Sequence, residues 1–246
     1  MDINILLSAD ARLSSDAELE KNGLIRADRI ASLYALVFSG PPWNEFTLSL
    51  DCDSYFGLDT KPGDTCANCG DILQLAYPIG ETANKIRKEV SRPNGLLAIL
   101  EKENNLVGFT WGFSYESSEQ FAEDKYKVEI YQNNIVDLLK KSGVNKDFYY
   151  FSETGIAPEE RGQNLSNILA KEIINKGYSL NLPVVMRTNW QSPMVAVARK
   201  FNMVQILGSI PLIDSMSKTI FNTGLTINGL DLENRDRVLF VSYPKP

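Results

Sequence analysis

The chain of 246 residues contains no histidine. This absence excludes the serine–histidine and cysteine–histidine pairs of hydrolases, histidine proton shuttles, and every metal site that needs an imidazole ligand. Acid–base chemistry in this protein must therefore use carboxylates, tyrosine, lysine, cysteine, the backbone or water.

Long apolar segments are also missing, because no stretch approaches the roughly 18 consecutive apolar residues of a membrane span. The first residues, Met-Asp-Ile-Asn-Ile, lack the basic and apolar regions of a signal peptide. We therefore expect a cytoplasmic location and no membrane partner.

Basic residues are too few to suggest a large positive surface. The chain has 25 lysine and arginine residues against 31 aspartate and glutamate residues, which gives a net charge of −6. This balance argues against a nucleic-acid partner. It is compatible with a cationic acceptor such as an amine and, more simply, with charge that serves only solubility.

The sequence does contain 43% hydrophobic residues, arranged in short strands and amphipathic helices. Strands are expected at residues 2–8, 96–101, 106–115, 148–156, 182–187, 204–213 and 237–243, and helices at 26–38, 80–91, 163–176 and 193–202. This order predicts an α/β or α+β fold with a mixed sheet around one core. We expect a single enlarged domain over residues 1–246, with a cysteine-containing insertion at 48–78 and a helical insertion at 117–146.

The most informative segment is residues 152–166, where a strand rich in aromatic and β-branched residues ends at Pro158. A polar turn follows and leads into an amphipathic helix. This order directs the N–H groups of the helix start, and the positive end of its dipole, at whatever lies beyond the strand. Such a corner suits a phosphate or pyrophosphate, and the alternative is an ordinary capped strand–turn–helix.

Residues 148–203 resemble the GNAT superfamily of N-acetyltransferases. The acyl-CoA signature of that family, Arg/Gln-x-x-Gly-x-Gly/Ala at a helix start, reads Arg161-Gly-Gln-Asn-Leu-Ser166 here, after Ile156-Ala-Pro-Glu-Glu160. An asparagine after the next strand is matched by Asn189. Pro41-Pro-Trp-Asn-Glu45 and the 96–115 hairpin also occur in the family's order, so the resemblance spans roughly residues 24–210 outside the two insertions.

The resemblance implies a mostly antiparallel sheet and a site for acetyl-CoA as acyl donor. Backbone amides of the turn would hold the pyrophosphate, while the strand end would pair with the pantetheine arm and polarise the thioester carbonyl. Asn189 would bind the pantetheine or the departing thiolate. The implied binding residues are Thr154, Gly155, Ile156, Arg161, Gly162, Gln163, Asn164, Leu165, Ser166 and Asn189.

The signature departs from the family pattern at two glycine positions. The glycine that allows backbone to approach the pyrophosphate is Asn164 here, and the following small position is Ser166. Asparagine tolerates unusual backbone angles and caps helices well, so we expect the turn to keep its shape.

The implied reaction is the direct attack of an amine, on a small molecule or a peptide, upon the thioester. In the family a carboxylate on this strand often takes the amine's proton, usually through water, which makes Glu153 the candidate base. The alternatives are that Glu153 binds substrate or only solvates the strand. Trp43, Glu45 and Trp111 are candidates for the acceptor side, with simple packing as the alternative for the tryptophans.

The family's general-acid tyrosine is replaced by Ala198, which belongs to an apolar stripe at helical spacing. Tyr149, Tyr150, Ser192 or water would then have to protonate the thiolate. This absence leaves a second hypothesis open: a GNAT-like sensor or interaction protein that binds acyl-CoA without turnover.

All three cysteines lie within the 48–78 insertion. Cys66-Ala-Asn-Cys69-Gly70 has the form of a zinc knuckle, and Cys52 precedes it by 14 residues. Structural zinc takes four ligands, so an aspartate (Asp51, Asp53 or Asp64), water or another chain would have to complete the site. The alternative is a loop with free or redox-active thiols, or one used for protein interaction.

Overall fold

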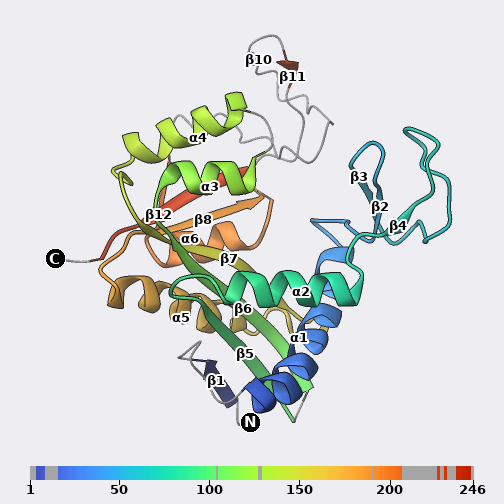
Figure 1. The fold of residues 1–246 in the computed structure, drawn as a ribbon, viewed down its shortest axis with the longest axis horizontal. Helices are drawn as coiled ribbons and strands as arrows, with labels where there is room; N and C mark the ends of the chain where they lie inside the picture. Colours follow the sequence, from blue (N-terminus) through green and yellow to red (C-terminus); the bar gives the residue numbers. More distant parts are fainter. Residues whose placement is uncertain are drawn as a thin grey trace. The chain divides into compact units, whose positions relative to one another are not determined.

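The computed structural model describes residues 4–8, 16–103, 105–126, 129–189, 191–206, 226–227, 230–231 and 237–244 (Figure 1). The chain divides into two compact units. The first comprises residues 1–49, 55–114 and 151–176, and the second comprises residues 50–54, 115–150 and 177–246.

The first unit contains four neighbouring strands in the order β1 (Asn4–Ser8), β5 (Leu96–Lys102), β6 (Asn105–Tyr115) and β7 (Phe148–Ile156), the last of which enters this unit at Phe151. Antiparallel pairing joins β1 to β5 and β5 to β6. The four strands expected for this part of the chain are therefore confirmed.

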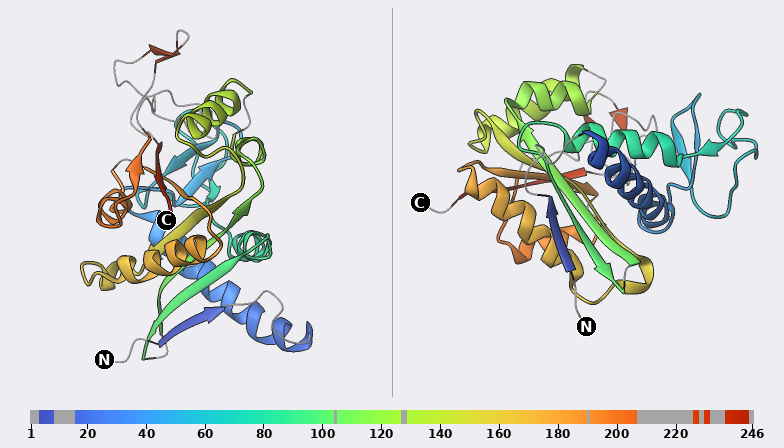
Figure 2. Two further views of the ribbon diagram at one scale, coloured as in Figure 1. Left: turned by 90° about the vertical axis from the view of Figure 1, so that its left-hand side faces the viewer. Right: turned by 60° about the horizontal axis from the view of Figure 1, so that its bottom comes forward.

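Helices cover this sheet on both faces, as Figure 2 shows: α1 (Asp16–Ser39) and α2 (Ile79–Val90) pack together on one side, and α5 (Leu165–Ser179) lies on the other. The expected helices at 26–38, 80–91 and 163–176 are all present. Helix α1 begins ten residues earlier than expected, at Asp16.

A β-bulge decides which side chains of β6 face which helix. The β5–β6 register shifts by one residue between Leu100 and Glu101. The extra residue places Val107 in the cluster under α5, together with Leu169, whereas Phe109 stacks on Tyr34 of α1. A bulge interrupts the alternation of faces along a strand, so residues 107 and 109 point to opposite sides despite their even spacing.

A second, three-stranded sheet occupies the cysteine-containing insertion. Its strands are β2 (Thr47–Ser49), β3 (Ser54–Phe56) and β4 (Gln74–Leu75), in the order β3-β2-β4, with β2 and β4 antiparallel. The segment that the sequence marks as irregular thus has a small sheet of its own.

In the second unit the strand order is β7, β8 (Val184–Asn189), β12 (Arg237–Ser242) and β9 (Val204–Gln205). Strand β12 pairs antiparallel with both β8 and β9. Most of the strand expected at 204–213 lies outside the described residues. A short hairpin of β10 (Thr226–Ile227) and β11 (Leu230–Asp231) is also present.

The expected helical insertion of the second unit consists of α3 (Ser118–Lys125) and α4 (Glu129–Lys141), which pack together. Helix α6 (Met194–Lys200) follows β8. The rings of Tyr115, Phe121 and Phe148 pack at centroid distances of 5.2 to 5.7 Å. Together the two units give the expected α/β fold, a mostly antiparallel sheet flanked by helices. Within the described ranges, no helix has the length and apolar character needed to cross a membrane.

The close approach of Gly155 to Phe109 gives a testable consequence. A Cβ at Gly155 would lie 2.4 Å from Cζ of the Phe109 ring, which is itself fully buried. We expect Gly155→Ala to lower the free energy of unfolding by about 1–3 kcal/mol, because the overpacked ring must move. Chemical denaturation followed by circular dichroism measures this loss.

The matched control is Gly80→Ala in α2, where an added Cβ meets nothing within 4 Å. Alanine is the better helix former, so this variant should be as stable as the parent or more stable, by up to about 1 kcal/mol. Equal effects at both positions would contradict the packing argument.

Candidate functional site

Glu153 lies in β7 and meets side chains from two helices. Its Oε1 accepts a hydrogen bond from the Tyr34 hydroxyl at 3.2 Å and lies 3.5 Å from Lys85 Nζ. Lys85 Nζ also donates to the Tyr34 oxygen at 3.3 Å. These three residues, the Glu153 cluster, connect β7, α1 and α2.

Two further carboxylates lie in the same unit, each only 8% exposed. Glu89 Oε2 accepts hydrogen bonds from Trp111 Nε1 at 2.7 Å and from Ser152 Oγ at 2.9 Å. Glu45 accepts a hydrogen bond from the Tyr77 hydroxyl. Of the candidates for the acceptor side, Trp111 is fully buried and donates to Glu89, and Glu45 is paired with Tyr77.

These carboxylates change the titration of their neighbours. Burial raises the pKa of Tyr34 well above its usual value, and the charges of Glu153, Glu45 and Glu89 raise it further, so the phenol remains protonated. Loss of water acts to lower the pKa of Lys85, but the charges of Glu153 and Glu89 outweigh this and raise it. The local field therefore favours a bound positive charge.

Aromatic rings surround the Tyr34 side chain. Its ring centroid lies 4.3 Å from that of Phe38, 4.9 Å from that of Tyr77 and 5.9 Å from that of Trp111. Trp43 extends this group, since its ring lies 5.3 Å from Phe38. Lys85 Nζ lies 5.2 Å from the Tyr34 centroid, at the end of the ring that carries the hydroxyl.

The turn after β7 contains two residues in the left-handed conformation. A short 3₁₀ helix at Pro158–Glu160 leads to Gly162, with φ of 83°, and Asn164, with φ of 65°. Helix α5 begins at Leu165, directly after these two left-handed residues. Left-handed residues next to a helix start turn successive N–H groups into one concavity, which binds phosphates. Asn164 thus keeps a positive φ, as expected from the tolerance of asparagine for this conformation.

The polar side chains of this turn are bonded to other groups of the protein. The Arg161 guanidinium donates to the carbonyl oxygens of Ile156, at 3.4 Å, and Val37, at 3.3 Å. Lys102 Nζ lies 2.8 Å from Glu160 Oε1, and their hydrogen bond lowers the pKa of that carboxyl. Gln163 donates to the second oxygen of Glu160 at 2.6 Å. The turn therefore presents its backbone, more than these side chains, to a ligand.

The remaining candidates of the strand end are placed by packing. Thr154 Oγ1 lies 2.7 Å from Thr110 Oγ1 on the neighbouring strand. Ile156 and Leu165 are both buried in the cluster under α5, so any binding role for them is confined to the backbone. Ser166 follows in the first turn of α5 and is partly buried.

The candidates of the second unit are buried. Asn189 ends β8, is 5% exposed, and accepts a hydrogen bond from the Gln191 N–H at 2.8 Å. Ala198 is fully buried, which confirms the expected core face of α6. Burial raises the pKa of Tyr149, and Ser192 Oγ accepts from the Met194 N–H at 3.2 Å. Tyr150 is likewise buried, 5.7 Å from the Tyr115 ring.

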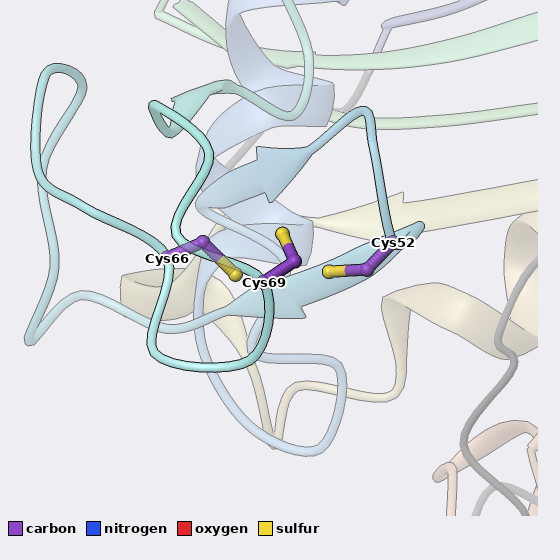
Figure 3. Close-up of side chains that lie close together, drawn as sticks. All are labelled: Cys52, Cys66 and Cys69. Carbon is purple, nitrogen blue, oxygen red and sulfur yellow. The ribbon is translucent and has the colours of Figure 1, made fainter.

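The structure also brings the three cysteines together. Their sulfur atoms lie within 4.8 Å of one another (Figure 3). Asp51, Asp53 and Asp64 do not belong to this group, which the described residues form from cysteines alone.

Sequence reasoning missed Tyr34, Tyr77, Lys85 and Glu89 as members of the site. Tyr34 lies within the helix expected at 26–38, where its ring fits the apolar face of that helix. One signal was available for Glu89, because it shares the buried face of α2 with Thr82, Ala83 and Ile86. A carboxylate on an otherwise apolar face indicates a buried partner.

No protein-family model and no curated protein sequence matches this chain. Solved structures do match. The polyamine N-acetyltransferase of Drosophila melanogaster, which forms N-acetylagmatine, is similar over 98% of this chain and 100% of its own, with 13% identity and a TM-score of 0.53.

Two further structures match 98% of this chain and 100% of their own. They are an agmatine N-acetyltransferase, with 14% identity and a TM-score of 0.49, and a mosquito arylalkylamine N-acetyltransferase-like protein, with 12% identity and a TM-score of 0.47. At such low identity the match to the Drosophila structure establishes the fold alone.

The buried contact between Glu89 and Trp111 generates a prediction. We expect Glu89→Ala to lower the free energy of unfolding by about 2–4 kcal/mol, because it leaves the Trp111 N–H buried without an acceptor. Glu89→Gln keeps an acceptor oxygen and should lose about half as much. Urea denaturation followed by circular dichroism gives both values.

Lys88→Ala provides the reference, since Lys88 is exposed on the same helix and should change stability by no more than about 0.5 kcal/mol. A Glu89→Ala variant as stable as this reference would show that the hydrogen bond to Trp111 contributes nothing.

Proposed function

The chain has the GNAT fold, and we propose that it transfers an acetyl group from acetyl-CoA to an amine of a small molecule or peptide. The observation that carries this proposal is the Glu153 carboxylate, held by Tyr34 and Lys85 in the same unit as the left-handed turn before α5. Direct acyl transfer from a CoA thioester requires a proton acceptor and a site for the CoA phosphates. Here the first lies on β7 and the second would lie in the turn after it.

The donor side rests on the turn. The backbone at Gly162 and Asn164 fits a pyrophosphate, because both residues have positive φ and the start of α5 follows. We assign the pyrophosphate to the backbone amides of residues 161–166 and the pantetheine arm to the strand end at 154–156. Acetyl-CoA supplies the activated acyl group, and this chain supplies orientation and proton transfer.

The acceptor side favours an amine that carries positive charge. The raised pKa of Lys85 means that carboxylates at this place stabilise an ammonium more than the loss of water disfavours it. The Drosophila protein of the same fold acts on polyamines, and this class of acceptor agrees with the field described here.

Proton transfer is assigned to one oxygen of Glu153. Tyr34 and Lys85 both contact Oε1, and within the described part of the chain no side chain is bonded to Oε2. Oε2 is therefore the oxygen that takes the proton from the bound ammonium, through water. The neutral nitrogen then attacks the thioester carbon, the C–N bond forms, and the C–S bond breaks.

The departing CoA thiolate needs a proton from elsewhere. Ala198 offers no hydroxyl, and Tyr149 is buried with a raised pKa. We assign this proton to the acceptor nitrogen, which loses a second proton as the amide forms, with water as the relay to the thiolate. The buried alanine also favours the second candidate function, a sensor that binds acyl-CoA without turnover, because the sensor needs the donor side only.

Replacing the proposed base separates these two functions. We expect Glu153→Gln to lower the rate of CoA release by about 10²–10⁴-fold, because the amide cannot accept the proton, while the dissociation constant for CoA stays unchanged. The assay follows free CoA thiol with a panel of primary amines that do or do not carry a second positive charge.

Glu159→Gln is the matched control, because Glu159 is an exposed carboxylate in the segment that follows β7. It should leave the rate unaltered. Tight CoA binding without release of CoA from acetyl-CoA in the presence of any amine of the panel would favour the sensor over the enzyme.

The left-handed conformation of Asn164 predicts the binding of CoA. Asn164→Gly should bind CoA as well as the parent or better, because glycine adopts positive φ without strain. Asn164→Val should weaken binding about tenfold, since a β-branched residue in this conformation costs roughly 1–2 kcal/mol. Isothermal titration calorimetry with CoA measures both, and equal affinities would remove the turn from the site.

A further inference from the structure

We propose that Cys52, Cys66 and Cys69 bind one zinc ion, and that this ion orders the insertion between β2 and α2. The sulfur atoms of the three residues lie within 4.8 Å of one another and point into one space (Figure 3). Two sulfurs held 2.3 Å from one tetrahedral zinc are about 3.8 Å apart, so only small side-chain movements are needed.

The knuckle Cys66–Gly70 already has the backbone that surrounds a metal. Gly70 has φ of 83°, and its N–H donates to the Cys66 carbonyl at 2.9 Å, which closes a tight turn. The Asn68 N–H points at Cys66 Sγ from 3.4 Å. A backbone N–H donated to sulfur stabilises the thiolate that a metal requires.

The other two sulfurs have hydroxyl neighbours. Ser49 Oγ lies 3.1 Å from Cys69 Sγ, and Ser54 Oγ lies 3.2 Å from Cys52 Sγ. Ser49 ends β2 and Ser54 begins β3, so Cys52 is held in the short loop between two paired strands. The Cys52 thiol donates to Ser54 Oγ, and either atom of the Ser49–Cys69 pair can be the donor, so both hydroxyls can donate to sulfur once the thiols lose their protons.

The insertion lacks the apolar core that would otherwise order it. Leu50, Leu58, Ile72 and Leu75 are each between 45% and 66% exposed, whereas Leu73 is buried. A segment that exposes most of its leucine and isoleucine side chains gains little from their burial. Metal binding supplies folding energy in such segments.

Zinc suits this donor set better than the alternatives. Thiolates select zinc over magnesium and calcium, which prefer oxygen ligands. Because the described residues contribute three cysteines and no carboxylate to the group, we assign the fourth position to water. Binding replaces the three thiol protons with the metal and releases them to solvent.

The zinc site shares its small sheet with the proposed acceptor side. Strand β2 pairs with β4, and the Phe46 carbonyl accepts from the Ala76 N–H at 3.0 Å. Immediately beyond these residues, Tyr77 donates to Glu45. We infer that zinc at one end of the sheet fixes the Glu45–Tyr77 pair at the other.

The test begins with the purified full chain. We expect about one zinc per chain by elemental analysis. With the metal bound, a thiol reagent should react slowly, and after chelation it should titrate all three cysteines, which are the only ones in the sequence. Cobalt in place of zinc should give the absorption bands of tetrahedral thiolate coordination. Less than about one-tenth zinc per chain with three fast thiols would overturn the proposal.

Single variants test the ligands. Cys52→Ser, Cys66→Ser and Cys69→Ser should each lose most of the zinc, while Asp51→Asn, from the same loop but outside the group, should keep it. If a serine variant fails to fold, hydrogen exchange on the wild-type chain decides. Chelation should speed exchange at the Phe46 and Ala76 amides, and zinc but not magnesium should reverse it. Unchanged exchange would contradict an ordering role.

Discussion

The hydrogen bond from Tyr34 to Glu153 is the contact on which the site depends. The two residues are 119 positions apart in the sequence, and their contact joins α1 to the strand that ends at the proposed donor turn. A carboxylate that is mostly removed from water needs such a partner, because an unpaired charge there would cost several kcal/mol. Lys85 provides the second partner from α2. Two helices and a strand are therefore positioned by one side-chain charge.

Local patterns predicted most of the framework correctly. Strands β5, β6 and β7 and helices α2 and α5 follow from apolar periodicity, and the left-handed backbone at Asn164 follows from the tolerance of asparagine for positive φ. The fold could be predicted because each element carries its own pattern. The turn could be predicted because its conformation depends on a few adjacent residues.

The partners of Glu153 could not be predicted, for a physical reason. Tyr34 sits on the apolar face of its helix, where a tyrosine ring and a phenylalanine ring give the same pattern, and only the tertiary contact reveals the role of the hydroxyl. The directions of the side chains along β6 could not be predicted from the sequence either. The bulge between Leu106 and Gly108 reverses the alternation, so counting by twos would place Val107 beside Phe109.

The same charges that would hold an ammonium also make its chemistry harder. A field that raises the pKa of Lys85 acts in the same direction on a bound substrate amine and keeps it protonated, whereas attack on a thioester needs a neutral nitrogen. Binding and reaction therefore make opposite demands on one set of carboxylates. In the proposed reaction an asymmetry within Glu153 would reconcile them: Oε1 is engaged by Tyr34 and Lys85, which would hold the charge in place, and Oε2 would take the proton.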